Sequence, residues 1–174
     1  WLVKKMPLIT GGGIPQTRGV INGRISYKHP FIELVSKFVG GVLALSAGLS
    51  LGREGPSVQI GSYVGCLVSK WGRVLAGERK QLLAAGAGAG LAAAFAAPLA
   101  SSLLVIESIE RFDAPKTAIT TLLAGVVAGG VASMIFPINP YFQIDAISPG
   151  LTFFSQVKLF LLLAAVISVS GKIY

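Results

Sequence analysis

Long apolar stretches separated by short polar ones set the pattern of this chain. The first apolar stretch covers residues 30–51 and carries Glu33 and Lys37 near its start. These two residues are four apart with the acid first, a favourable spacing on a helix, and we expect a surface or interfacial pair near the helix end. An uncharged run over residues 117–136 is long enough to span a bilayer with modest tilt. A last apolar stretch covers residues 151–174.

Prolines break the other apolar stretches into short helices. Pro56 is tolerated in the first turn of a helix, and the apolar pattern after it predicts a helix over residues 56–71. At about 1.5 Å per residue this helix covers ~24 Å, which is short for a hydrocarbon core of ~30 Å. The polar residues 77–80 predict a turn that closes it. Pro98 then divides the next stretch into two short helices, residues 81–96 and 98–110.

Glycines four residues apart recur along these stretches. The pairs are Gly48/Gly52, Gly61/Gly65, Gly86/Gly90 and Gly125/Gly129. Small residues at this spacing allow transmembrane helices to approach closely. Together the pairs predict a tightly packed helical bundle.

Composition indicates an integral membrane protein. Of the 174 residues, 53% are hydrophobic and 13% are charged, with a mean hydropathy of +0.73, well beyond the balance of soluble domains. The net charge of +8 does not indicate a nucleic-acid partner, because the basic residues are scattered between apolar spans. The single cysteine, Cys66, excludes an internal disulfide framework and argues against a metal cluster. We therefore predict an all-α, multi-pass protein whose surroundings are the lipid bilayer.

One carboxylate lies at the N-terminus of a predicted helix. Glu54 lies in the stretch Gly52-Arg53-Glu54-Gly55-Pro56, just before the helix that Pro56 opens. Free N–H groups and the positive end of the helix dipole favour an anion at this position. The same position would suit a bound halide. A carboxylate and a free anion that compete for one site form a gate, and Glu54 is the candidate.

Two other classes of function stay open from the residues alone. Glu107, Glu110 and His29 could form the metal site of an intramembrane hydrolase, but His29 lies in another segment and no paired histidine motif exists. A solvated helix end neutralised by Arg111 is the simpler interpretation of the two acids, and no enzyme activity is predicted. A structural or assembly role without transport is the other alternative.

Three motifs carry a resemblance to a known family. They are Gly11-Gly12-Gly13-Ile14-Pro15, then Gly52-Arg53-Glu54-Gly55-Pro56 followed by Val58-Gln59-Ile60-Gly61, and the glycine- and alanine-rich run over residues 86–100 with Phe95 and Pro98. In their order and spacing the chain resembles the CLC family of chloride channels and proton-coupled chloride transporters. Their helices are interrupted, as in transporter sites built from discontinuous helices.

The resemblance implies a homodimer in which each subunit has its own anion pathway and is built from two inverted halves. Residues 1–174 would form a single transmembrane domain fragment, the first half of that fold plus the first helix of the second half. The chain opens without Met and stops within an apolar pattern, so we expect a part of a larger membrane protein. The family's third anion loop and its pore tyrosine are not in this sequence.

The resemblance also assigns roles to residues. Glu54 matches the gating glutamate, and Gly12, Gly13, Ile14, Arg53 and Gly55 belong to loops whose backbone N–H groups face the anion. Chloride is the implied transported ligand, with no cofactor and no metal, and the implied location is the cell membrane if the protein is bacterial. We expect the Arg53 side chain to point away from the ion and to help hold its loop.

The sequence departs from the family pattern at three positions. Gly12 stands where chloride-selective members commonly carry Ser, which leaves open a fluoride-selective protein. Gln16 replaces a usual Glu, with no clear consequence. Ser108 occupies the position of the internal proton-transfer glutamate, so Glu54 and Glu107 are the remaining proton-transfer candidates, and a proton-coupled exchanger is the other alternative within the family.

Overall fold

The computed structural model describes residues 2–110, 115–136 and 153–173, and these residues form helices joined by short loops, with no strand among them. The chain divides into two compact units, Trp1–Ile138 and Asn139–Tyr174. The second unit contributes one described helix, α8 (Phe153–Ile173), which coincides with the last apolar stretch predicted from the sequence. The first unit holds the elements α1 (Leu2–Lys5), η1 (Pro7–Ile9), α2 (Ile14–Ile21), α3 (Pro30–Ser46), α4 (Glu54–Trp71), α5 (Ala76–Phe95), α6 (Pro98–Val105), η2 (Ile106–Glu110) and α7 (Pro115–Ile135).

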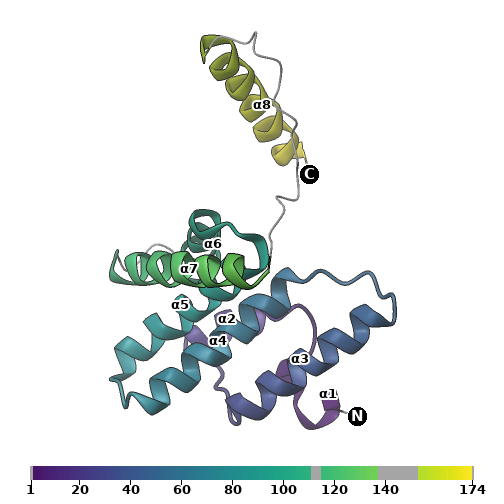
Figure 1. The fold of residues 1–174 in the computed structure, drawn as a ribbon, viewed down its shortest axis with the longest axis vertical. Helices are drawn as coiled ribbons and strands as arrows, with labels where there is room; N and C mark the ends of the chain where they lie inside the picture. Colours follow the sequence, from purple (N-terminus) through teal and green to yellow (C-terminus); the bar gives the residue numbers. More distant parts are fainter. Residues whose placement is uncertain (1, 111–114, 137–152, 174) are drawn as a thin grey trace. The chain divides into compact units, whose positions relative to one another are not determined.

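Helices α4 and α5 lie side by side at the centre of the first unit (Figure 1). Their backbones touch where the predicted glycine pairs face each other. A Cβ at Gly61 would overlap the carbonyl of Gly86, and one at Gly65 would overlap the carbonyl of Leu82. A Cβ at Gly90 would overlap the carbonyl of Ser57. The close approach predicted for these pairs is therefore confirmed.

The proline break is confirmed where α5 ends and α6 begins. Ala96 ends α5 in the left-handed region (φ 53°), and Pro98 starts α6 at the position where a missing N–H costs nothing. Helix α7 crosses this break and packs on both helices, with Gly125 against Ala92 and Pro98. The break therefore lies inside the bundle.

Two sequence predictions are wrong in detail. Residues 77–80, predicted as a turn, lie in the first turns of α5, because Glu78, Arg79 and Lys80 are good helix formers. The pair Gly48/Gly52 is not a packing face. It lies in the loop between α3 and α4, and a Cβ at either position would meet nothing within 4 Å.

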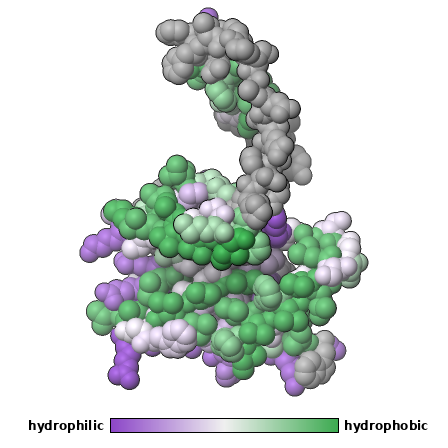
Figure 2. Space-filling model, viewed as in Figure 1, coloured by the Kyte–Doolittle hydropathy of each residue, from purple (hydrophilic) through white to green (hydrophobic). Residues whose placement is uncertain are grey.

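Apolar side chains cover much of the surface of the first unit. On the face shown in Figure 2, hydrophobic residues spread over α7 and the helices beside it, and hydrophilic residues gather at the periphery. Helix α7, predicted as a span, is the one described helix long and apolar enough to cross a membrane. Helices α5 and α8 have similar lengths, 20 and 21 residues, whereas α2 and α6 have eight residues each. This mixture of long and short helices agrees with the predicted broken-helix architecture.

Candidate anion site

The first glycine loop turns sharply into α2. Gly11 (φ 67°) and Gly13 (φ 98°) adopt the left-handed region, and Gly13 is the N-cap residue of α2. Glycine enters this region without the steric cost that other residues meet. Gly12 lies between them with open space around its Cβ position. Two of the three glycines are therefore needed by the backbone, whereas Gly12 is not.

The second loop lies directly against the first. Glu54 is the first residue of α4, and Arg53 is its N-cap residue, so Glu54 lies within the first turn rather than before it as predicted. A Cβ at Gly55 would overlap the carbonyl oxygen of Gly12. A Cβ at Gly13 would lie 2.6 Å from Oε1 of Gln59 and 2.8 Å from the carbonyl oxygen of Gly55. The structure thus brings together the two loops that the sequence placed more than 35 residues apart.

Two polar side chains donate hydrogen bonds to the backbone of the first loop and of the residues just before it. Lys37 Nζ donates hydrogen bonds to the carbonyl oxygens of Ile9 (2.8 Å) and Gly11 (2.7 Å). Gln59 Nε2 donates to the carbonyl oxygen of Leu8 (2.7 Å). Sequence reasoning missed both supports. The available signal was Lys37 itself, since an ionisable residue within an apolar stretch indicates a function by default.

The prediction of a surface pair at Glu33 and Lys37 is wrong. Glu33 is 4% exposed and Lys37 is 7% exposed. Glu33 Oε1 accepts a hydrogen bond from the backbone N–H of His29 (3.4 Å), and its Oε2 is buried without a hydrogen-bond partner. The pair is buried because α3 turns this face towards the first loop and the core, a tertiary contact that spacing along one helix cannot reveal.

Glu54 lines a cavity, and Ile14, at the end of the first loop, lines the same cavity. The cavity has a volume of about 220 Å³, and its wall is mostly apolar. It is lined by Ile14, Glu54, Val58, Leu91, Phe95, Ala97, Ala100, Ser101 and Leu104. Ile14 and Glu54 are the first residues of α2 and α4, so the N-termini of both helices reach this cavity. Free N–H groups at such termini are suited to an anion.

Arg53 lies beside the cavity rather than in its wall. Its guanidinium carbon lies 5.1 Å from the centre of the Phe95 ring, a cation–π distance. The Arg53 carbonyl accepts hydrogen bonds from the backbone N–H (3.1 Å) and the hydroxyl (2.8 Å) of Ser57. The residue thus joins the start of α4 to the end of α5. Its role towards an anion stays a prediction.

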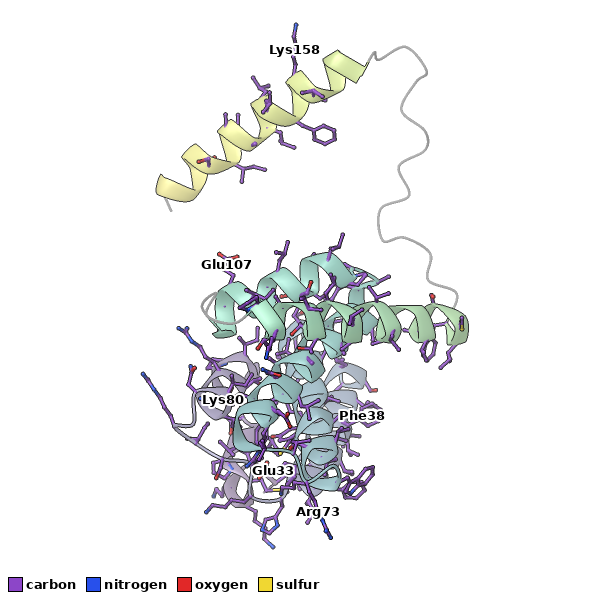
Figure 3. The ribbon with its side chains drawn as sticks, turned by 90° about the vertical axis from the view of Figure 1, so that its left-hand side faces the viewer. Glu33, Phe38, Arg73, Lys80, Glu107 and Lys158 are labelled. Atoms are coloured by element: carbon purple, nitrogen blue, oxygen red, sulfur yellow. The ribbon has the colours of Figure 1, made fainter. Side chains whose placement is uncertain are left out.

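The second proton-transfer candidate lies apart from the first. Glu107 is exposed in η2, a π-helical turn that continues α6, and it is absent from the lining of the Glu54 cavity. Figure 3 shows Glu107 pointing away from the helices of the first unit. Ser108 lies in the same turn, which packs beside α2. π-helical turns are frequent at functional sites.

The hydrolase alternative gains no support from the described part of the chain. Among those residues, no three His, Cys, Asp or Glu side chains come close enough to hold a metal ion. The Glu110 side chain and Arg111 lie outside the described residues.

Two glycine loops that open interrupted helices around one acid are typical of the ion sites of membrane transporters. The family model described as voltage gated chloride channel matches residues 1–174. The chain therefore belongs to this family, the CLC family, and the resemblance seen in its motifs is confirmed. Members of the family are integral membrane proteins.

The curated relatives are named as exchange transporters. The H(+)/Cl(-) exchange transporter ClcA of Vibrio cholerae serotype O1 is 38% identical over 174 residues, which cover 97% of this chain and 36% of the relative. ClcA of Citrobacter koseri is 41% identical over 139 residues, or 78% of this chain and 29% of the relative. The chain thus spans about a third of the length of these relatives.

A solved structure confirms the predicted fold class. The crystal structure of a slow cyanobacterial Cl-/H+ antiporter matches with a TM-score of 0.74 and 32% identity. The match covers 98% of this chain and 40% of the antiporter chain. An all-α CLC-type fold with short, broken helices is therefore shown for this chain.

Proposed function

We propose that this chain forms the gated part of a chloride pathway in a multi-pass, homodimeric membrane transporter. The observation that carries the proposal is the shared cavity, since Glu54 and Ile14 bring two helix N-termini to one space of about 220 Å³. The names of the relatives support chloride as the transported ion.

The proposed gate works by competition between two anions. Helix N-termini offer N–H donors and a partial positive charge, which replace part of the hydration of chloride without holding it as tightly as a full charge. The ionised carboxylate of Glu54 uses the same donors and blocks the pathway. Protonation removes its charge, or chloride displaces it, and the pathway opens.

Replacing Glu54 with Gln tests the gate. In liposomes containing the full-length protein, we expect Glu54→Gln to remove the pH dependence of chloride efflux, because the amide has the shape of the acid but carries no charge. Glu78→Gln, at an exposed acid in the first turn of α5, is the matched control and should keep the pH dependence of the unmodified protein. If Glu54→Gln leaves both the rate of chloride efflux and its pH dependence unchanged, the proposal that Glu54 is the gate is wrong. Absence of efflux from the unmodified protein would favour an assembly role.

Gly12 provides a test of anion preference. Its Cβ position is open and its φ is not left-handed, so Gly12→Ser fits without strain. A hydroxyl donor to an anion contributes about 1.5–3 kcal/mol, and we expect chloride to bind roughly tenfold more tightly. Calorimetric titration with chloride and fluoride measures the change. A gain in affinity for fluoride alone would favour the fluoride-selective alternative.

Proton coupling is the second candidate, favoured by the exchange transporters among the relatives. Glu54 and Glu107 are the proposed proton carriers, with Ser108 at the usual internal position. Proton uptake against a chloride gradient at a fixed ratio would establish coupling despite Ser108. Chloride flux without proton movement would establish a channel-like or uncoupled protein.

A further inference from the structure

A second pocket lies at the end of α4 opposite Glu54. Its volume is about 270 Å³, and we call it the basic pocket. It is formed where the start of α3 meets the last turns of α4, and it is lined by Lys28, His29, Pro30, Phe31, Ile32, Leu67 and Lys70. Three of these side chains are nitrogen bases, and the other four are apolar. The combination suits a ligand with an anionic head and a hydrocarbon body.

The charge around the basic pocket is positive. Lys28, His29 and Lys70 are all exposed. Glu33, an acid in the first turn of α3, is 4% exposed, and its Oε1 accepts a hydrogen bond from the backbone N–H of His29. Arg73 extends the basic region beyond α4 and points away from the helices (Figure 3). The positive end of α3 and the negative end of α4 meet here and largely offset each other, so the side chains determine the sign.

An apolar strip leads away from the basic pocket along α3. Phe31 is 64% exposed and Phe38 is 56% exposed, with Val35 and Val42 on the same face. In Figure 3, Phe38 lies at the edge of the bundle. Trp71, next to Lys70, is 83% exposed, as expected for an aromatic side chain at the level of lipid headgroups. The basic pocket therefore adjoins a surface suited to an acyl chain.

We propose that the basic pocket binds the phosphate headgroup of an anionic phospholipid, with an acyl chain along the apolar strip of α3. Basic pockets between transmembrane helices are suited to such headgroups. Lys28 and Lys70 contact the phosphate from two sides of the basic pocket. The site is separate from the chloride pathway and goes beyond the proposed function.

Trp71 provides the readout. The full-length protein is placed in vesicles of brominated phosphatidylglycerol or brominated phosphatidylcholine, and the quenching of Trp71 is taken as the difference from a Trp71→Phe variant. We expect stronger quenching by the anionic lipid. Each lysine near an anionic lipid contributes roughly fivefold in binding, so the double variant Lys28→Gln/Lys70→Gln should lower the preference by roughly 25-fold.

Two further variants control for charge and folding. Lys4→Gln/Lys116→Gln removes the same charge from exposed lysines outside the basic pocket and should keep the preference. Lys28→Arg/Lys70→Arg keeps the charge of the basic pocket, and this variant should also keep the preference for the anionic lipid. Equal quenching by both lipids in the unmodified protein would overturn the site. Loss of the preference on adding inorganic phosphate would reassign the basic pocket to free phosphate and overturn the lipid proposal. None of these readouts requires chloride flux.

Discussion

Gly55→Ala should reduce chloride flux through the full-length protein by at least an order of magnitude. The added Cβ would overlap the carbonyl oxygen of Gly12, and a backbone atom cannot turn aside as a side chain does. Overpacking of this kind costs typically 1–3 kcal/mol and forces the backbone to shift. A shift here separates the two loops, which we propose supply N–H groups to the anion path. Chloride efflux from liposomes measures the effect.

Gly52→Ala is the matched control for this substitution. Gly52 lies three residues before Gly55, in the loop that leads into α4, but a Cβ there would meet nothing within 4 Å and its φ is not left-handed. Its flux and thermal stability should stay close to those of the unmodified protein. If both variants lose flux equally, loop flexibility rather than the contact between Gly55 and Gly12 governs transport.

Local signals predicted the elements of this site well. Pro56 and Pro98 marked helix starts because a proline ring suits the first turn of a helix and not its interior. The glycines of α4 and α5 indicated close packing because few other residues let two helix backbones touch. These rules depend on neighbours in sequence or on residue size alone, so they hold without knowledge of the tertiary structure.

The contacts between segments could not be predicted in the same way. Nothing local indicates that the Gly12 carbonyl meets Gly55, or that Gly48 and Gly52 stay in open space while the other pairs pack. Likewise, the spacing of Glu33 and Lys37 is the same for an exposed pair and a buried one. Burial depends on which segments cover α3: α4 packs against this helix, and Lys37 reaches the carbonyl oxygens of Ile9 and Gly11.

Lys37→Met should weaken the fold and chloride binding together. The variant removes the donor to the carbonyl oxygens of buried Ile9 and exposed Gly11, and an unsatisfied buried acceptor costs about 1–3 kcal/mol. The first loop then loses its support from α3. We expect the free energy of unfolding to fall by about 2–5 kcal/mol and chloride to bind more weakly. Thermal unfolding and calorimetric titration of the detergent-solubilised protein measure the two effects, with Lys4→Met, at an exposed lysine, as control.

Combining Lys37→Met with Glu33→Gln separates the two roles of Lys37. Lys37 is the one cationic residue of α3, so in its absence no positive side chain of this helix lies near the buried carboxyl group of Glu33, whose Oε2 has no hydrogen-bond partner. Removing one of two buried opposite charges costs more than removing both. The double variant should therefore recover part of the lost stability but not the lost chloride binding, because the hydrogen bonds to the first loop stay broken. Strictly additive stability losses would show that Glu33 and Lys37 do not act on each other.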